Sequence, residues 1–211
     1  MKVLHIDCSV RNEASLSRQL SGFFVTELRN KEPGLALDYL DLGAAAPDHV
    51  SALFIEGNYT SPERRTPEMI AELAASDKLI GRLHDADVYV IGMPMYNFTV
   101  PSNFKVFIDN VVRTGMTFRI QGMVSEGLLV NKKVYVINTR GVDFSHEAIK
   151  PMDQLVPYLK TIFAFIGLDD AQFIDVFPVK FSSEEVREKA IAAARQTISA
   201  CVRELCALVG A

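Results

Sequence analysis

The run VYVIG at residues 88–92, followed by the loop MPMYNFTVP at residues 93–101, decides the fold class of this chain. A continuous apolar run of this kind is typical of a parallel strand that is buried on both faces. In open parallel sheets, ligands bind outside the carboxyl ends of the strands. We therefore expect helices to alternate with further strands around this run, and the loops after the strands to carry the chemistry.

Apolar patterns on both sides of the run fit this expectation. Runs or alternations predict further strands at 3–6, 35–42, 133–138 and 172–177. Apolar residues at helical spacing predict helices at 16–30, 67–83, 101–112, 148–166 and 183–208. Thr66 and Pro67 suit a helix start, Ser182 or Ser183 opens the last helix, and Pro157 predicts a kink or break. This order predicts an α/β fold with a five-stranded, doubly wound parallel sheet and helices on both faces.

Composition narrows the classes of protein. The chain has 211 residues, of which 49% are hydrophobic, and its net charge of -4 gives no basic field for nucleic acid. No apolar run approaches the ~20 residues that span a membrane, and no signal peptide is visible. The three cysteines lack metal-ligand spacing, so we expect no metal site and a cytoplasmic location. Because no repeat or linker is visible, we expect residues 1–211 to form one domain. Residues 43–65 are longer than an ordinary connection, so we expect them to form a functional loop or to contain a short helix near 50–55.

The first candidate loop is SVRNEASLS at residues 9–17. It contains no glycine, which argues against both the GxGxxG dinucleotide turn and the P-loop. Its serine hydroxyls, Ser9, Ser15 and Ser17, together with free amides at a helix N-terminus, can hold a phosphate. Capping of the helix by Ser15 or Ser17 is the simpler explanation when this loop is taken alone.

Two more loops follow predicted strands. The loop at 93–101 is bracketed by two prolines and offers amides beside aromatic and apolar faces, which suit a flat isoalloxazine ring. The loop NTRGVD at 138–143 contains Gly141, which permits positive φ or a close approach, and Thr139, whose hydroxyl suits the pyrimidine side of such a ring. Ordinary turns that complete the core explain each loop separately.

Together these motifs resemble the FMN-dependent NADH-azoreductases, which are flavodoxin-like NAD(P)H:quinone oxidoreductases. The resemblance rests on Ser9 with Ser15-Leu16-Ser17, on Pro94-Met95-Tyr96-Asn97-Phe98, and on Thr139-Arg140-Gly141. It extends to GMTFR at 115–119, GLLVNKK at 127–133, and to PYL at 157–159 with FIG at 165–167. It therefore covers nearly the whole chain, and the PMYNF segment is its most specific part.

The resemblance implies a flavodoxin-like sheet of order 2-1-3-4-5 and one FMN per subunit, with NADH or NADPH as co-substrate. It assigns the phosphate to Ser9, Ser15, Leu16 and Ser17, the ring to Pro94, Met95, Tyr96, Asn97 and Phe98, and its pyrimidine edge to Thr139, Arg140 and Gly141. It further implies a homodimer with the active site at the subunit interface, where Phe118 or Ile120 covers the partner's flavin. Phe144 is a further candidate for the substrate side.

The implied activity is ping-pong, two-electron reduction of quinones and reductive cleavage of aromatic azo compounds. A flavodoxin-type electron carrier and a flavin-binding redox sensor without NAD(P)H turnover are the alternatives. No catalytic acid is assigned, and Tyr96 and His146 are candidates by position. Arginines 11, 18 and 140 could assist anion binding, but a position on the solvated surface is the simpler expectation. Val142 and Ile120 depart from the family pattern, so the acceptor pocket is the part that the resemblance defines least.

Overall fold

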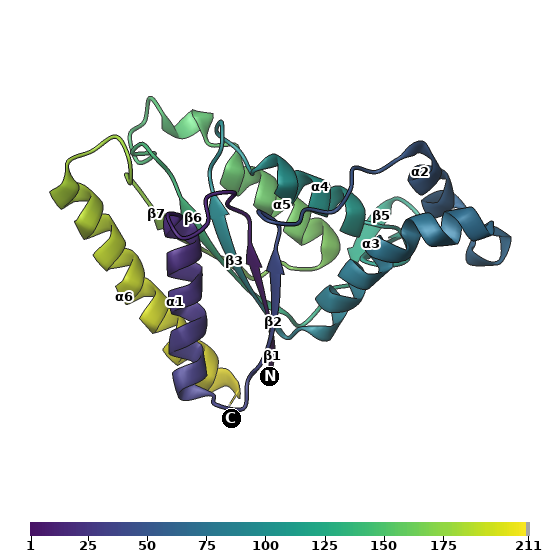
Figure 1. Cartoon of the computed structure of the whole chain (residues 1–211), viewed down its shortest axis with the longest axis horizontal. Helices are drawn as coiled ribbons and strands as arrows, with labels where there is room; N and C mark the ends of the chain where they lie inside the picture. The colour runs from purple at the N-terminus through teal and green to yellow at the C-terminus, as the bar shows by residue number, and fades with distance from the viewer. Residues whose placement is uncertain (210–211) are drawn as a thin grey trace.

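The computed structural model of the protein describes residues 1–209 and contains a five-stranded parallel sheet. Its strands are β1 (Lys2–Asp7), β2 (Ala36–Asp41), β3 (Val88–Pro94), β6 (Lys133–Thr139) and β7 (Ala171–Val176). Their order is β2-β1-β3-β6-β7, and all carboxyl ends lie at the upper edge of the sheet in Figure 1. The predicted sheet and its 2-1-3-4-5 order are confirmed.

Helices cover both faces of the sheet. They are α1 (Leu16–Lys31), α2 (Ala52–Tyr59), α3 (Pro67–Asp85), α4 (Ser102–Val111), α5 (Leu155–Ile166) and α6 (Glu184–Val209), with 3-10 turns η1 (Pro62–Arg64) and η2 (Lys150–Met152). α1 and α6 lie on one face, whereas α3, α4 and α5 lie on the other (Figure 1). None of the described helices is long and apolar enough to span a membrane.

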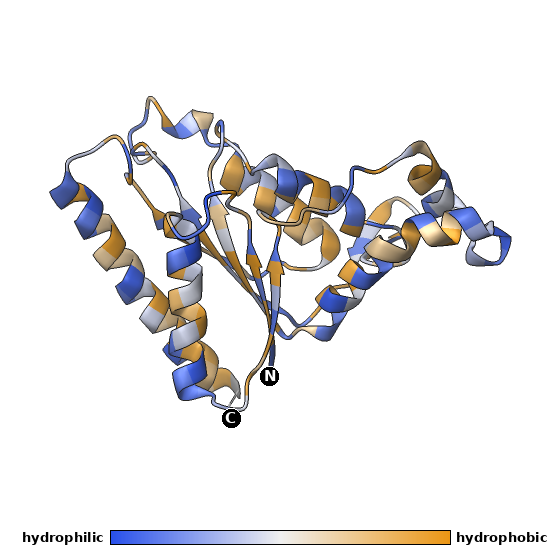
Figure 2. Cartoon of the chain, in the orientation of Figure 1, coloured by the Kyte–Doolittle hydropathy of each residue, from blue (hydrophilic) through white to orange (hydrophobic). Residues whose placement is uncertain are grey.

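β3 shows why the sheet forms. All seven of its residues are buried, and successive side chains point to opposite faces. Val88 and Val90 pack with the apolar residues of α1 and α6, whereas Tyr89 and Ile91 pack with those of α3, α4 and α5. Figure 2 shows the complementary pattern on the helices, whose hydrophobic stripes face the sheet and whose polar residues face outward. The apolar run at 88–92 therefore supports two cores at once.

The predicted helix starts are confirmed at three places. Ser15 caps α1 by accepting a hydrogen bond from the Arg18 amide, at 3.4 Å. Thr66 caps α3 in the same way, with Pro67 in the first turn. The Ser183 hydroxyl accepts a bond of 3.4 Å from an amide in the first turn of α6. Each oxygen satisfies an amide that has no partner within its helix.

The predicted helix at 148–166 is wrong at its start. α5 begins at Leu155, where the Asp153 carboxylate accepts bonds from the amides of Leu155 and Val156, at 2.9 and 3.3 Å. Pro157 is the third residue of the helix and does not break it. Proline is tolerated in the first turn because the amides there need no acceptor in the helix.

The segment between α4 and β6 forms a hairpin that the sequence analysis did not predict. Its strands β4 (Phe118–Gln121) and β5 (Val124–Gly127) pair antiparallel. Phe118 packs on Phe165 of α5, with 4.5 Å between ring centroids. Residues 43–65 do contain a short helix, α2, which begins at Ala52 and is slightly later than expected.

Candidate active site

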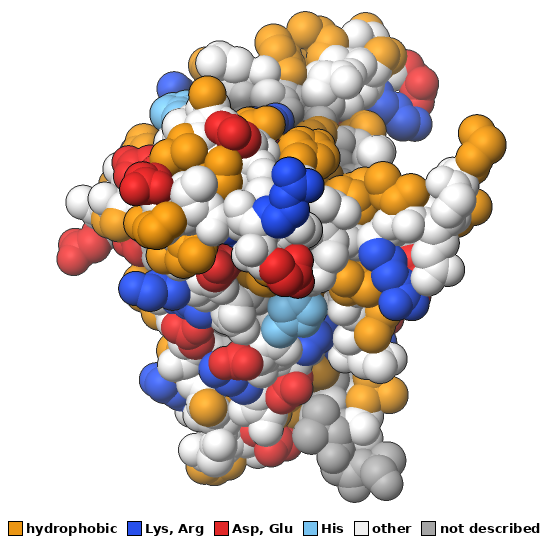
Figure 3. Space-filling view, turned by 90° about the vertical axis from the view of Figure 1, so that its right-hand side faces the viewer, with side chains coloured by type: hydrophobic (Ala, Val, Ile, Leu, Met, Phe, Trp, Pro, Cys, Tyr) orange, Lys and Arg blue, Asp and Glu red, His pale blue; other side chains and the backbone are white. Residues whose placement is uncertain are grey.

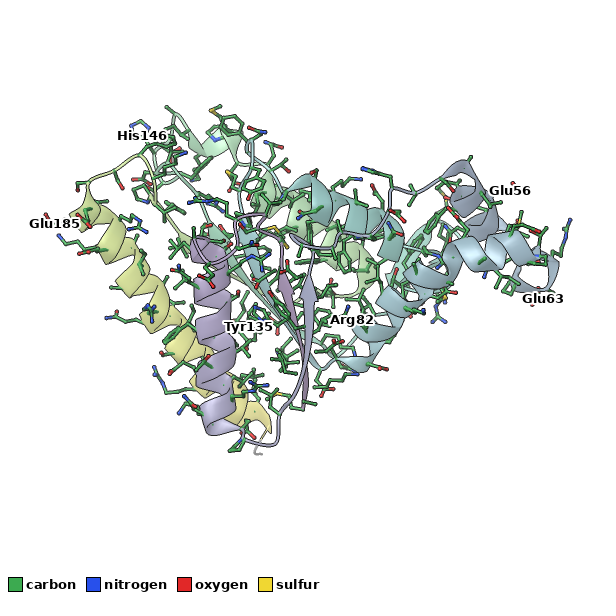
Figure 4. The ribbon with its side chains drawn as sticks, in the orientation of Figure 1. Glu56, Glu63, Arg82, Tyr135, His146 and Glu185 are labelled. Atoms are coloured by element: carbon green, nitrogen blue, oxygen red, sulfur yellow. The ribbon has the colours of Figure 1, made fainter. Side chains whose placement is uncertain are left out.

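A cavity of about 800 Å³ opens at the carboxyl ends of β1, β3 and β6. Its walls come from the three loops that the sequence analysis singled out and from the segment between β7 and α6. Figure 4 shows this end of the molecule, with His146 and Glu185 labelled near its upper edge. The fold therefore brings segments that are far apart in the sequence to one site, as the switch-point rule for parallel sheets predicts.

The loop after β1 contributes hydroxyls and the start of α1. Ser9, Ser15 and Leu16 line the cavity. Ser17 is fully buried behind them, and its hydroxyl lies 3.1 Å from that of Ser15. Ser15 therefore both caps the helix and faces the cavity, while Ser17 supports Ser15.

The loop after β3 is a tight, strained turn. Tyr96 and Thr99 exchange backbone hydrogen bonds of 3.0 and 3.1 Å, and Asn97 and Phe98 between them have φ of 47° and 69°. Positive φ at both central residues is the geometry of a type I′ turn, which is costly for a bulky residue such as Phe98. Strain of this kind concentrates at functional sites. Pro94, Met95, Tyr96 and Asn97 line the cavity.

The loop after β6 approaches the cavity through Thr139 and Gly141. Neither Gly141 nor Val142 has positive φ. A Cβ on Gly141 would instead lie 3.2 Å from the ring of Phe181, so the lack of a side chain at residue 141 lets this ring pack close to the backbone. Val142 therefore does not conflict with the backbone of this loop.

Arg140 in the same loop is buried, with 3% of its side chain exposed, and the expectation of a solvated arginine is wrong here. Its guanidinium lies 3.2 Å from Asp153 and 3.1 Å from Asp175. It also lies over the rings of Phe144 and Phe177, 5.4 and 5.1 Å from their centroids. Arg140 is not among the residues that line the cavity, so its side chain joins the ends of β6, β7 and α5 behind the loop.

Arg18 is the second arginine that the structure removes from the solvated surface. Two of its nitrogens donate to the Ser9 carbonyl, at 3.1 and 2.7 Å, and its guanidinium also pairs with the Asp41 carboxylate. Arg11, in contrast, is exposed and lines the cavity. Arg18 therefore fixes the backbone of the loop after β1 from behind.

A chain of hydrogen bonds, buried except at Tyr39, lies beneath this arginine. Asp7 accepts from Ser21 at 2.8 Å and from Tyr39 at 2.9 Å, and the Ser21 hydroxyl lies 2.9 Å from His5. Burial raises the pKa of Asp7, but the His5 ring, whose Nε2 lies 3.6 Å from the carboxylate, and hydrogen bonds from Ser21 and Tyr39 outweigh it, and the net pKa is lowered. Burial and the nearby Asp7 charge raise the pKa of Tyr39 to about 12. The network therefore contains a carboxylate and a neutral phenol at neutral pH.

Comparisons with known proteins agree with this geometry. A family model described as flavodoxin-like fold matches residues 1–202. An "FMN-dependent NADH:quinone oxidoreductase 1" from Trichormus variabilis is 40% identical over 203 residues, which cover 96% of each chain. An "FMN-dependent NADH:quinone oxidoreductase" from Delftia acidovorans is 39% identical, and the match covers 94% of this chain and 93% of that protein.

The chain belongs to this flavodoxin-like family. The resemblance drawn from its motifs is confirmed. Among solved structures, an azoreductase from Bacillus anthracis str. Sterne superposes with a TM-score of 0.89 at 24% identity and covers 97% of this chain and 99% of its own. An FMN-dependent NADH-azoreductase from B. anthracis str. Ames Ancestor, solved in complex with FMN, gives a TM-score of 0.83 at 20% identity and covers 96% of this chain and all of its own. At these identities the two structures support the flavodoxin-like fold.

Four cavity residues outside the three candidate loops were not predicted from the sequence. They lie between β7 and α6 or in the first turns of α6: Val179, Lys180, Phe181 and Arg187. This segment is held to the loop after β6, because the amides of Lys180 and Phe181 donate to the Gly141 carbonyl at 3.2 and 3.0 Å. No local sequence motif marks this segment. The topology could have identified it, because the fifth strand of a flavodoxin-like sheet ends at the same edge as the others.

The remaining candidates lie outside this cavity. Phe144 is buried at 5% exposure against Phe177, and His146 is exposed and accepts a bond from the Ala148 amide at 3.2 Å. Phe118 and Ile120 lie on the β4–β5 hairpin. No group of three or more potential metal ligands occurs within residues 1–209.

Proposed function

We propose that this chain is an FMN-dependent NAD(P)H oxidoreductase that reduces quinones by two electrons and cleaves aromatic azo compounds in two such rounds. The observation that carries the proposal is the convergence of three predicted loops on one cavity of about 800 Å³. The names of relatives that match at 39–40% identity over nearly the whole chain support it. We further propose that residues 1–211 act as one FMN-binding domain in the cytoplasm, where the three free cysteines would remain reduced.

The cavity residues fit FMN. Ser9, Ser15 and the amides at the start of α1 suit the phosphate, with Ser17 behind them. Apolar and aromatic side chains suit the flat ring, and amides at the strained turn and in the loop after β6 suit its polar edge: Pro94, Met95, Tyr96, Asn97, Thr139 and Gly141. Phe98 belongs to the same strained turn but is not among the residues that line the cavity. Arg140 would act through the backbone of its loop. FMN, when bound, supplies the two-electron chemistry that links a nicotinamide nucleotide to the acceptor.

The chain itself would orient the reactants. NAD(P)H and the acceptor would occupy the same part of the cavity in turn, which gives ping-pong kinetics. Quinone reduction takes two electrons and a proton from NAD(P)H and a second proton from water or a side chain. Tyr96 is the candidate donor among the cavity residues, and its hydroxyl lies 3.4 Å from Ser9 Oγ. His146 lies outside the cavity lining.

The β4–β5 hairpin supports a homodimer with a shared active site. Three hydrophobic side chains on it are exposed, namely Ile120 at 65%, Met123 at 102% and Val124 at 69%. Figure 3 shows hydrophobic side chains interspersed with charged ones on the side of the molecule that lies at the right of Figure 1, where β5 is labelled. The ring of Phe118 packs on that of Phe165 in the same subunit, so Ile120 is the better candidate to cover the partner's flavin.

The proposal is tested with the purified full-length protein. Its absorbance is recorded near the flavin bands before and after FMN is added, and NADH oxidation is then followed with a soluble quinone. We expect bound FMN and sustained quinone reduction. If neither FMN nor FAD binds or raises the melting temperature, the proposal fails. If the FMN-loaded protein does not turn over NADH, an electron carrier or a redox sensor becomes the better interpretation.

A serine variant tests the phosphate assignment. In S15A/S17A we expect the Kd for FMN to rise about tenfold, because hydroxyl bonds to a charged group are lost. The Kd for riboflavin, which has no phosphate, should change by less than about twofold. Ser51→Ala is the matched control, because Ser51 caps α2 with a bond of 3.0 Å and lies outside the cavity. Equal losses of FMN and riboflavin would show that Ser15 and Ser17 only stabilise the helix.

A further inference from the structure

The charges around the cavity are one-sided. Arg11, Lys180 and Arg187 line it, and no aspartate or glutamate is among its lining residues. This is unexpected in a chain whose net charge is -4. A concave site with charge of one sign raises the local concentration of ligands of the opposite sign. The charged side chains of the cavity lining therefore favour an anionic ligand.

These three cations have no counter-ions of their own. Within residues 1–209, no carboxylate pairs with Arg11, Lys180 or Arg187, whereas the buried Arg18 and Arg140 both have aspartate partners. The described acidic residues at the start of α6 form no ion pair with these cations. Lys189 donates to Glu185 at 2.6 Å, and neither Glu184 nor Glu185 lines the cavity. The positive charge therefore remains available to a ligand.

The backbone holds the segment that carries two of these cations. The amide of Val179 donates to the Arg140 carbonyl at 3.0 Å, and that of Lys180 donates to the Gly141 carbonyl at 3.2 Å. Arg187 lies in the first turns of α6, where its amide donates to the Ser183 carbonyl at 3.0 Å. α6 packs beside α1, so Arg187 lies at the same end of the helix pair as the serine loop (Figure 1).

We propose that Arg11, Lys180 and Arg187 form a subsite for a phosphate group at the edge of the cavity. The serine loop offers only neutral donors, and this segment adds the charge that those donors lack. Phosphate reaches this cavity from two sources, the monoester of FMN and the diphosphate of NAD(P)H. The inference rests on the proposed function and adds to it three specificity-determining residues. Lys180 and Arg187 lie outside the three candidate loops, and Arg11 lies in the first of them.

The test compares K180Q/R187Q and R11Q with Arg203→Gln, which removes a cation from an exposed position of α6 outside the cavity. Apo-protein is titrated with FMN and with riboflavin, and the KM for NADH is measured on FMN-saturated enzyme. We expect the double variant to weaken FMN about tenfold or more and riboflavin less than about twofold, because charge-assisted bonds to phosphate are lost. The FMN effect should shrink in about 0.5 M NaCl, which screens exposed charges.

Each outcome decides the proposal. Weaker FMN binding assigns the subsite to the flavin phosphate, and a higher KM for NADH with unchanged FMN binding assigns it to the nucleotide. If both quantities match those of Arg203→Gln, the subsite does not exist. A wild-type protein that binds no flavin would overturn the proposed function instead. Calorimetric titration with inorganic pyrophosphate would then decide the subsite, since wild type should bind it and K180Q/R187Q should not.

Discussion

Gly43→Ala is expected to lower the free energy of unfolding by about 3 kcal/mol, the upper end of the usual cost of overpacking. A Cβ at residue 43 would overlap the Ser9 carbonyl oxygen and would lie 2.5 Å from Arg18 Nη2 and 2.7 Å from the Ser9 carbonyl carbon. Neither neighbour can yield cheaply. The carbonyl is backbone, and the guanidinium is bound to both Ser9 and Asp41.

The same substitution should also weaken FMN binding. Ser9 lines the cavity, and any shift of its carbonyl displaces its hydroxyl as well. Gly81→Ala is the matched control, because a Cβ there meets nothing within 4 Å. Gly81 lies inside α3, where alanine should stabilise the protein by about 0.5–1 kcal/mol. Urea unfolding and FMN titration of both variants check the prediction. If G43A equals wild type in both, Gly43 does not need the close approach that its surroundings indicate.

This glycine illustrates what the sequence alone could not reveal. Residues 88–92 predicted the central strand because burial on both faces requires a continuous run of apolar residues, which is visible in the sequence. The contact of Gly43 with Ser9 and Arg18 has no such sequence pattern, because it depends on three segments that meet only after the sheet has formed. Arg18 and Arg140 were assigned to the surface for the same reason. Their aspartate partners are distant in the sequence. Asp41 lies 23 residues from Arg18, and Asp175 lies 35 residues from Arg140.

The errors in secondary structure have local causes. The β4–β5 hairpin has strands of only four residues, most of them exposed, so it carries no clear apolar alternation. The segment before α5 contains Ile149 and Met152, whose spacing extends the apolar pattern of the helix and concealed its true start at Leu155. The candidate loops were predictable because the carboxyl edge of a parallel sheet is fixed by topology. The segment after β7 lies at the same edge, but its residues carry no motif that would distinguish them from an ordinary connection.

Arg140→Met is expected to cost about 3 kcal/mol of stability, as is usual when one partner of a buried ion pair is removed. The reason lies in its two aspartates. The side chain of Asp175 is 46% exposed and would be solvated, whereas that of Asp153 is 15% exposed and would retain a poorly compensated charge. Methionine keeps part of the apolar contact with the rings of Phe144 and Phe177. The loss therefore comes mainly from charge rather than from volume, and urea unfolding at pH 7 measures it.

The double variant R140M/D153N separates this cause from others. An asparagine in place of Asp153 carries no charge but keeps an oxygen for the amides of Leu155 and Val156, which Asp153 caps at 2.9 and 3.3 Å. The double variant should therefore recover about 1 kcal/mol or more of the loss. Flavin affinity then distinguishes two roles for Arg140. If its side chain touches the flavin, R140M and R140M/D153N lose FMN affinity equally. If it acts by holding the backbone of Thr139 and Gly141, affinity recovers together with stability, because the loop and its buried support are one structure.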